Sequence, residues 1–60
     1  MRTITDYRND VTGELAPPHV LGTDERGRRL YGRVDGWTPV DATGREVAVE
    51  YDRDGNMTAA

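Results

Sequence analysis

The chain has 60 residues, enough for one small domain, and a net charge of -3 from 11 acidic and 8 basic side chains. At this size only roughly 60% of the unfolded chain's surface can be buried, so the domain needs additional stabilisation. Because the sequence has no Cys and a single His, disulfides and thiolate zinc sites are excluded. Association with another chain is the source of stability that remains.

The composition also excludes several classes of function. The acidic balance lacks the basic footprint of a non-specific nucleic-acid binder, which argues against nucleic acid as a partner. No apolar run approaches the roughly 18 residues of a membrane span, and no signal peptide is recognisable. We therefore expect no membrane partner and a cytoplasmic or virion-associated location. All basic residues are Arg, and Lys, Ser and Cys are absent, which removes most side-chain nucleophiles.

The N-terminal third is predicted to form a hairpin. Residues 3–8 are expected to be a strand that turns at residues 9–13 into a short strand at residues 14–16. Its apolar side chains Ile4, Val11 and Leu15 should be buried, and Tyr7 and Leu15 can share a face. Two prolines then separate residues 1–18, an N-terminal arm or hairpin, from residues 19–60, the core meander. Both parts belong to one domain, residues 1–60.

A four-residue Asp-x-x-Gly pattern recurs at residues 10–13, 24–27, 41–44 and 52–55. Asp in the first position caps a type I turn, and Gly supplies the left-handed residue of a bulge. Asp35-Gly36 is a further two-residue hairpin signal. Between the last two turns, residues 45–51 alternate in polarity as a half-buried strand does. With no helical period, the pattern predicts an all-β antiparallel meander of about five or six short strands that curls toward a small barrel.

The turn types also predict which residues face one another, because each hairpin turn fixes a register. The predicted partners are Thr23 with Arg29, Leu21 with Tyr31, Val20 with Gly32, Val34 with Trp37, Tyr31 with Val40, Gly32 with Pro39, Pro39 with Val47, Trp37 with Val49, and Tyr51 with Met57. Together these registers place one set of side chains on a single face, the expected core: Val20, Leu30, Val34, Trp37, Pro39, Val47, Val49, Tyr51 and Met57. The missing side chain of Gly32 should leave room for the indole of Trp37. Pro39 should mark a bend or bulge.

The opposite face offers a candidate protein-binding site. Leu21, Tyr31 and Val40 form an apolar row across three predicted strands, and Arg29 and Arg33 flank the row. Apolar side chains with tyrosine and arginine are typical of protein interfaces. The alternative is that the N-terminal strand folds over this row and makes it the inside of a barrel.

Residue types that carry chemistry are sparse. His19 follows two prolines at a strand start and is interpreted as a surface or capping residue. Asp52, Asp54 and Asn56 alternate like the start of a calcium-binding loop, but Met57 stands where that loop requires Gly, so they are interpreted as turn formers. We find no nucleophile–base pair and no phosphate loop. The sequence predicts a protein that is not an enzyme, with no cofactor and no metal.

Residues 51–58 resemble one unit of a YD (Rhs-type) repeat, with Tyr51-Asp52 followed by Gly55-Asn56. Proteins of that family are long β shells built from many copies. The resemblance covers eight of the sixty residues once, so it implies a hairpin of the same chemistry and not a shell.

Two functions of different classes follow. The first is a small non-enzymatic β module that binds a protein partner or itself, such as a structural or decoration subunit, or an accessory subunit, of a larger, phage-type assembly. The second is a small regulator that docks on nucleic acid, or on an enzyme that processes it, through an Arg cluster: Arg26, Arg28, Arg29 and Arg33. The competing interpretation of that cluster is solvated hairpin charge offset by neighbouring carboxylates.

Overall fold

The computed structural model describes residues 3–60, which form seven short antiparallel strands and no helix. The strands are β1 (Asp6–Asn9), β2 (Leu15–Ala16), β3 (Val20–Thr23), β4 (Arg29–Tyr31), β5 (Trp37–Val40), β6 (Val49–Tyr51) and β7 (Met57–Ala59). The predicted all-β antiparallel class is confirmed.

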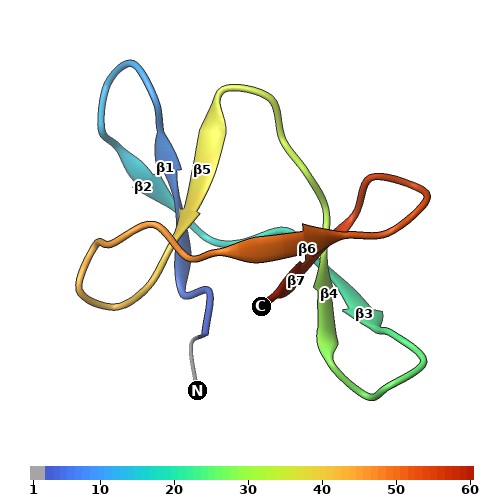
Figure 1. The fold of residues 1–60 in the computed structure, drawn as a ribbon. Coiled ribbons are helices and arrows are strands. Elements are labelled where there is room, and N and C mark those ends of the chain that lie inside the picture. The colour runs from blue at the N-terminus through green and yellow to red at the C-terminus, as the bar shows by residue number, and fades with distance from the viewer. Residues whose placement is uncertain (1–2) are drawn as a thin grey trace.

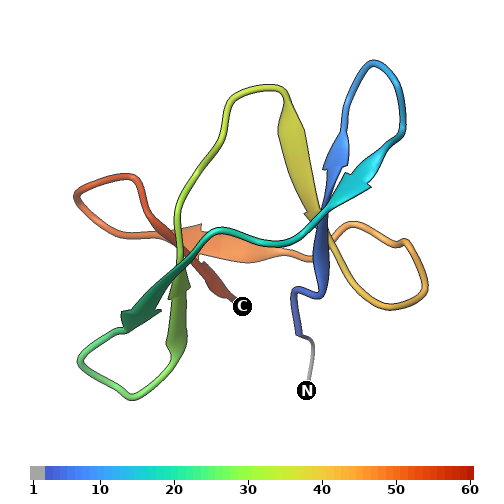
Figure 2. The same cartoon turned by 180° about the vertical axis from the view of Figure 1, so that it is seen from behind.

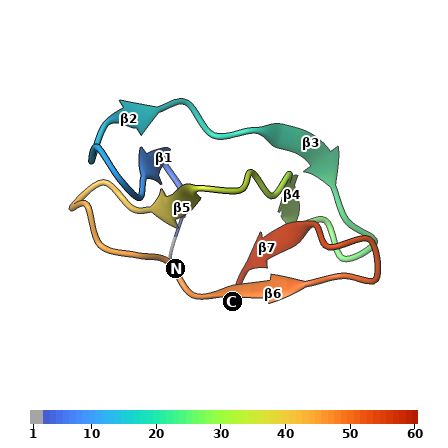
Figure 3. The ribbon, with the colours of Figure 1, turned by 90° about the horizontal axis from the view of Figure 1, so that it is seen from above.

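The strands form two separate sheets, with the orders β2-β1-β5 and β3-β4-β7-β6. The sheets lie side by side, and the hairpin loops point outward from them (Figure 1). One connection between the sheets, from β2 to β3, crosses the back of the molecule (Figure 2). Seen from above, β2 and β3 follow one edge and β6 the opposite edge (Figure 3). Among the described strands the curl does not close into a barrel.

Three of the predicted turns share one hydrogen-bonding scheme. The Oδ1 atoms of Asp24, Asp41 and Asp52 each accept two backbone N–H groups, two and four residues further on, at 2.8 to 3.0 Å. The glycine that ends each turn has a φ between 76° and 84°, which favours Gly because a side chain there is strained. Local sequence therefore determines these hairpins.

The first hairpin departs from the predicted turn by one residue. Asn9, not Asp10, is the cap, and its Oδ1 accepts the N–H groups of Val11 and Thr12 at 2.9 and 3.0 Å. Asp10 instead joins the neighbouring hairpin: its N–H donates to the carbonyl of Gly36 at 2.8 Å, and its carboxylate accepts the hydroxyl of Thr38. An Asn in the preceding position offered the same capping chemistry as Asp.

The predicted registers are correct next to the turns and wrong further away. Thr23 faces Arg29 and Tyr51 faces Met57, as expected. A bulge at Leu21, however, shifts β3 so that Val20 faces Tyr31. Since such a bulge inserts one extra residue, Leu21 loses the predicted place opposite Tyr31.

The largest correction concerns which strands pair. The predicted meander places β5 beside β4, with Tyr31 facing Val40. In the structure β7 lies beside β4, where Tyr31 faces Met57, and β5 pairs with β1, where Val40 faces Asp6. The turn at Asp35-Gly36 closes as predicted, with the Trp37 N–H 3.2 Å from the Val34 carbonyl, but its ladder ends there.

Of two further predicted residue pairs, one is wrong and one is confirmed. Val49 pairs with Ala59 and not with Trp37. The Val47 N–H does donate to the Pro39 carbonyl at 3.0 Å, as expected. β5 is the last strand of its sheet, and only an isolated bridge between Val40 and Glu46 continues the pairing on its outer side, so the ladder that Pro39 interrupts is short.

The core lies between the two sheets and uses the N-terminal segment. Its buried cluster consists of Ile4, Tyr7, Tyr31, Val47 and Met57, each 2 or 3% exposed. The Tyr7 hydroxyl donates to the Gly32 carbonyl at 2.6 Å, and the Tyr31 hydroxyl to the Ile4 carbonyl at 3.4 Å. Both aromatic side chains thus bury their rings while their polar atoms are satisfied. Burial raises the pKa of Tyr7 above its usual value.

Much of the predicted core is in fact exposed. Val20 is 48%, Val34 39% and Tyr51 62% exposed, whereas Val47 and Met57 are buried as expected. The predicted face depended on the meander order of the strands, which is not the order in the structure. Trp37 and Val49 are only partly buried, against the edge of the core cluster.

The predictions for the N-terminal segment are also confirmed only in part. Ile4 is buried, but Val11 and Leu15 are 92% and 60% exposed. Leu15 pairs with Arg8, so it lies on the face opposite to Tyr7 and does not share a face with it. The expected contact of Gly32 with Trp37 is wrong as well: a side chain at Gly32 would overlap the ring of His19.

Candidate binding groove beside Trp37

The apolar row expected to bind a partner is not a surface of the folded chain. Tyr31 is 2% exposed and Val40 0% exposed, while Leu21 remains 47% exposed on the β3 bulge. Tyr31 is covered by the segment that contains Ile4, whose carbonyl accepts its hydroxyl. The sequence left open the alternative that the N-terminal segment covers this row. The structure shows this coverage for Tyr31.

The two arginines predicted at the rim lie in different places. Arg29 is exposed on β4 and borders a wide hollow that Thr3 and Ala60 also line. Arg33 is exposed in the connection from β4 to β5 and borders a narrower groove. The five predicted site residues are therefore not brought together as one surface.

The groove beside Arg33 is the feature that we consider the candidate site. It has a volume of about 220 Å³ and separates residues 33–39 from residues 46–51. Its apolar lining comes from Val34, Trp37, Pro39, Val47, Val49, Tyr51 and Met57, all members of the predicted core face, and Val47 and Met57 also belong to the buried core cluster. The elements that carry its lining residues, β5, β6 and the connection from β4 to β5, can be followed in Figure 1. Sequence reasoning found these residues but assigned them to the interior.

Backbone hydrogen bonds fix both walls of the groove. On one side, Trp37 begins β5 and faces Asn9 of β1, and the adjoining turn is held by the bond from Asp10 to Gly36. On the other side, β6 is paired along its length with β7. Val47 connects the walls through its bond to Pro39. A preformed groove of this kind loses little conformational entropy when it is filled.

The rim of the groove is predominantly acidic. Asp10, Asp35 and Glu46 contribute carboxylates, and Arg33 contributes a guanidinium. Arg33 lies 3.5 Å from Asp35, but the two side chains are 63% and 93% exposed, so water screens this pair. Asp10 and Glu46 make no ion pair within residues 3–60. Negative charge at the rim is therefore left without compensation.

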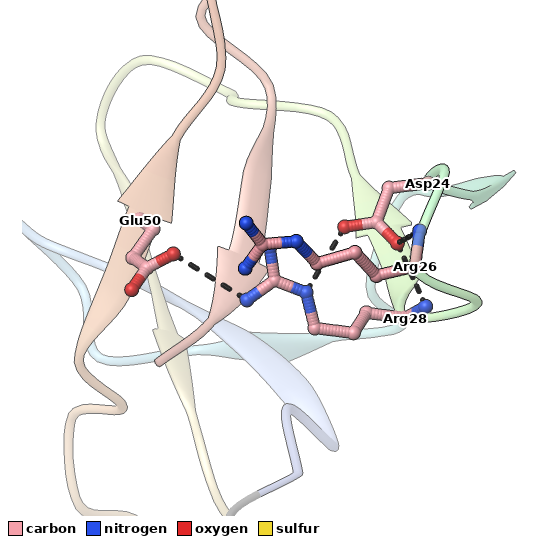
Figure 4. A network of polar contacts seen from close by, with 4 residues as sticks. All are labelled: Asp24, Arg26, Arg28 and Glu50. Atoms are coloured by element: carbon pink, nitrogen blue, oxygen red, sulfur yellow. Dashed lines mark hydrogen bonds and ion pairs between the residues drawn. The ribbon is translucent and has the colours of Figure 1, made fainter.

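Within the predicted Arg cluster, Arg28 has a structural task. The Arg28 guanidinium bridges two carboxylates, with Nε 3.0 Å from Asp24 Oδ2 and one terminal nitrogen 3.4 Å from Glu50 (Figure 4). Desolvation opposes the ionised form of Asp24, but the backbone N–H and the guanidinium of Arg28 outweigh it, and the pKa of Asp24 is lowered. Arg28 thus connects β6 to the second hairpin, which β3 and β4 form around residues 24–27, and its guanidinium is not free to bind a phosphate.

The described residues offer little for other chemistry. No group of three or more His, Asp or Glu side chains is placed to hold a metal ion in residues 3–60. Asp52 uses its Oδ1 atom on the backbone of its own turn. His19 is exposed, and its ring lies next to Gly32. The described part of the chain also contains no helix that could span a membrane.

Comparison with known proteins gives no assignment. No family model, no curated protein and no solved structure matches this chain. The groove is therefore the feature from which a function can be inferred.

Proposed function

We propose that this chain is a small non-enzymatic β module that binds another protein, or a second copy of itself, through the groove beside Trp37. The observation that carries the proposal is the partial exposure of an aromatic pair in a preformed groove, with Tyr51 62% exposed and Trp37 half-buried. Tyr and Trp are the residue types that most often anchor protein interfaces.

The size of the groove favours a protein partner over a small-molecule ligand. Its volume of about 220 Å³ is below the range of about 300–1,000 Å³ that is usual for small-molecule pockets. A single inserted side chain is a better match to such a space. The absence of Lys, Ser and Cys further supports a role without covalent catalysis. The small size of the chain is compatible with a structural or accessory subunit of a larger assembly, including a virion.

The proposed nucleic-acid role has less support. Arg28 is occupied by Asp24 and Glu50, and the net charge of the chain is -3. A phosphate contact by the remaining arginines would have to overcome general repulsion between the chain and a polyanion.

The proposal can be tested by selecting displayed peptides on the immobilised chain. Peptides selected on the native chain should bind Tyr51→Ala about tenfold or more weakly, because truncating a central aromatic anchor costs about 2 kcal/mol. Val11→Ala is the matched control: Val11 is exposed and apolar, lies at the tip of the first hairpin and is not among the residues that line the groove. Sedimentation of the free chain over a wide concentration range reports self-association.

Equal binding by the native chain, Tyr51→Ala and Val11→Ala, with a mass that does not depend on concentration, would contradict the proposal. Circular dichroism of each variant shows whether the fold is retained. Loss of self-association in Tyr51→Ala alone would support the second form of the proposal, in which the partner is another copy.

A further inference from the structure

We infer that the groove beside Trp37 accepts a cationic side chain, arginine or lysine, from a basic segment of a partner protein. The inference rests on the proposed function and specifies the chemistry of the partner. It combines two independent features of the groove: an aromatic wall and an uncompensated acidic rim.

The aromatic wall provides the first contact for a cation. Trp37 is partly exposed to the groove, and Tyr51 stands on the opposite wall at 62% exposure. The face of an indole attracts a guanidinium or ammonium group, and Trp is the strongest of the aromatic residues in this respect. The aliphatic stem of the same side chain can pack on Val34 and Val49, since long cationic side chains bury their stems on apolar surface.

The rim provides the second contact. Asp10 and Glu46 lie on the two sides of the groove and have no ion-pair partner in the described chain. Arg33 already accompanies Asp35. A further positive charge would therefore be attracted by both carboxylates, and a carboxylate beside a partly desolvated groove binds a guanidinium through charge-assisted hydrogen bonds.

Charge also favours a different protein over a second copy. Two copies would each bring a net charge of -3 to the contact, and like charges slow encounter and oppose association. A basic partner is instead drawn toward the acidic rim and oriented by it.

The experiment uses the fluorescence of Trp37, the one Trp in the sequence. A capped tetra-arginine peptide is titrated into the native chain, and a peptide of the same length with citrulline, the neutral isostere of arginine, is titrated in parallel. The arginine peptide should change the Trp37 emission saturably, and the citrulline peptide should not.

Matched variants separate the groove from general electrostatics. Glu46→Gln should weaken the arginine peptide by about tenfold, as expected when one partner of a close charge pair is removed. Glu25→Gln makes the same change in net charge at the exposed tip of the second hairpin, outside the groove, and should leave the affinity nearly unchanged.

Three results would overturn the inference: equal responses to the arginine and citrulline peptides, equal losses in Glu46→Gln and Glu25→Gln, or a Trp37 emission that changes only with the concentration of the chain itself. These outcomes are distinct from failure of the proposed function. Peptides selected on the chain that depend on Tyr51 but not on basic residues would retain the groove as a binding site and reject only its cationic ligand.

Discussion

The core cluster and the Trp37 groove are built from the same kinds of residues but end in opposite states. In the core, Tyr7 and Tyr31 are 3% and 2% exposed, and their hydroxyls are bonded to backbone carbonyls. In the groove, Tyr51 is 62% exposed and Trp37 is only half-buried. The N-terminal segment covers the first region through Ile4, whereas no segment of residues 3–60 closes the second.

The difference shows how a chain of this size distributes its apolar surface. With 60 residues it can close one small core. The second set of apolar side chains then lies beside that core, supported by it but open to solvent. Exposed aromatic residues on a fixed framework are typical of protein-binding sites, which is why we propose the groove as the binding site and assign stability to the cluster.

The largest effect is expected for Tyr31→Ala. Removing a buried aromatic ring from a small core costs about 3–5 kcal/mol, which is comparable to the whole stability of a domain this small. We expect the variant to be largely unfolded at room temperature by circular dichroism and urea titration. Tyr51→Ala should remain folded, since its side chain is mostly exposed. If Tyr51→Ala unfolds the chain as Tyr31→Ala does, the two regions are not distinct.

Tyr7→Phe should have an intermediate effect, with a dependence on pH that identifies the core. Loss of the bond to Gly32 should cost about 1 kcal/mol at neutral pH. Because burial raises the pKa of Tyr7, the folded state holds this proton more tightly than the unfolded state. Stability is therefore complete below the ordinary pKa of about 10 and falls as pH rises through the raised value. Urea titrations of the native chain should show this alkaline loss, and a loss of equal size in Tyr7→Phe would be evidence against it.

A hairpin outside both regions should give the smallest effect. The Thr43 hydroxyl, which donates to Asp41, and the backbone N–H groups of Thr43 and Arg45 lower the pKa of Asp41. Its contribution to stability is present above its ordinary pKa of about 4 and is lost as pH falls through the lowered value. Asp41→Asn should thus reduce the melting temperature by a few degrees at neutral pH and by less at low pH. The control is Asp54→Asn, because the Asp54 carboxylate accepts no hydrogen bond in the described chain. This variant should melt like the native protein at neutral and at low pH. If its melting temperature falls as much as that of Asp41→Asn, the proposed role of Asp41 is wrong.

The sequence was informative where structure is local. An Asp cap and a Gly with positive φ suffice to define the turns at Asp24, Asp41 and Asp52, because all of their hydrogen bonds lie within five residues. The antiparallel all-β class follows from these turns. Registers failed as soon as a bulge or a second neighbour intervened, as at Leu21.

Strand order could not be predicted because it is decided by non-local competition. The turn at Asp35-Gly36 is satisfied by a single bond whether or not β5 continues beside β4. In the structure β7 pairs with β4, and β5 pairs with β1. Because of this difference in strand pairing, Tyr31 and Val40 lie in the interior and not on the predicted binding face. The predicted core face around Trp37 is left open. Of the five predicted site residues only Arg33 borders the groove, and the apolar residues that line the groove had been predicted as core.

Quenching of the Trp37 fluorescence by acrylamide tests the central claim most directly. The sequence contains one Trp, so the signal reports the groove alone. We predict efficient quenching in the free chain and protection when a selected peptide binds, with no protection in Tyr51→Ala. A Trp37 that resists quenching in the free chain would be a core residue, and a Trp37 that stays equally accessible in the complex would not be at the binding site; either result would contradict the account.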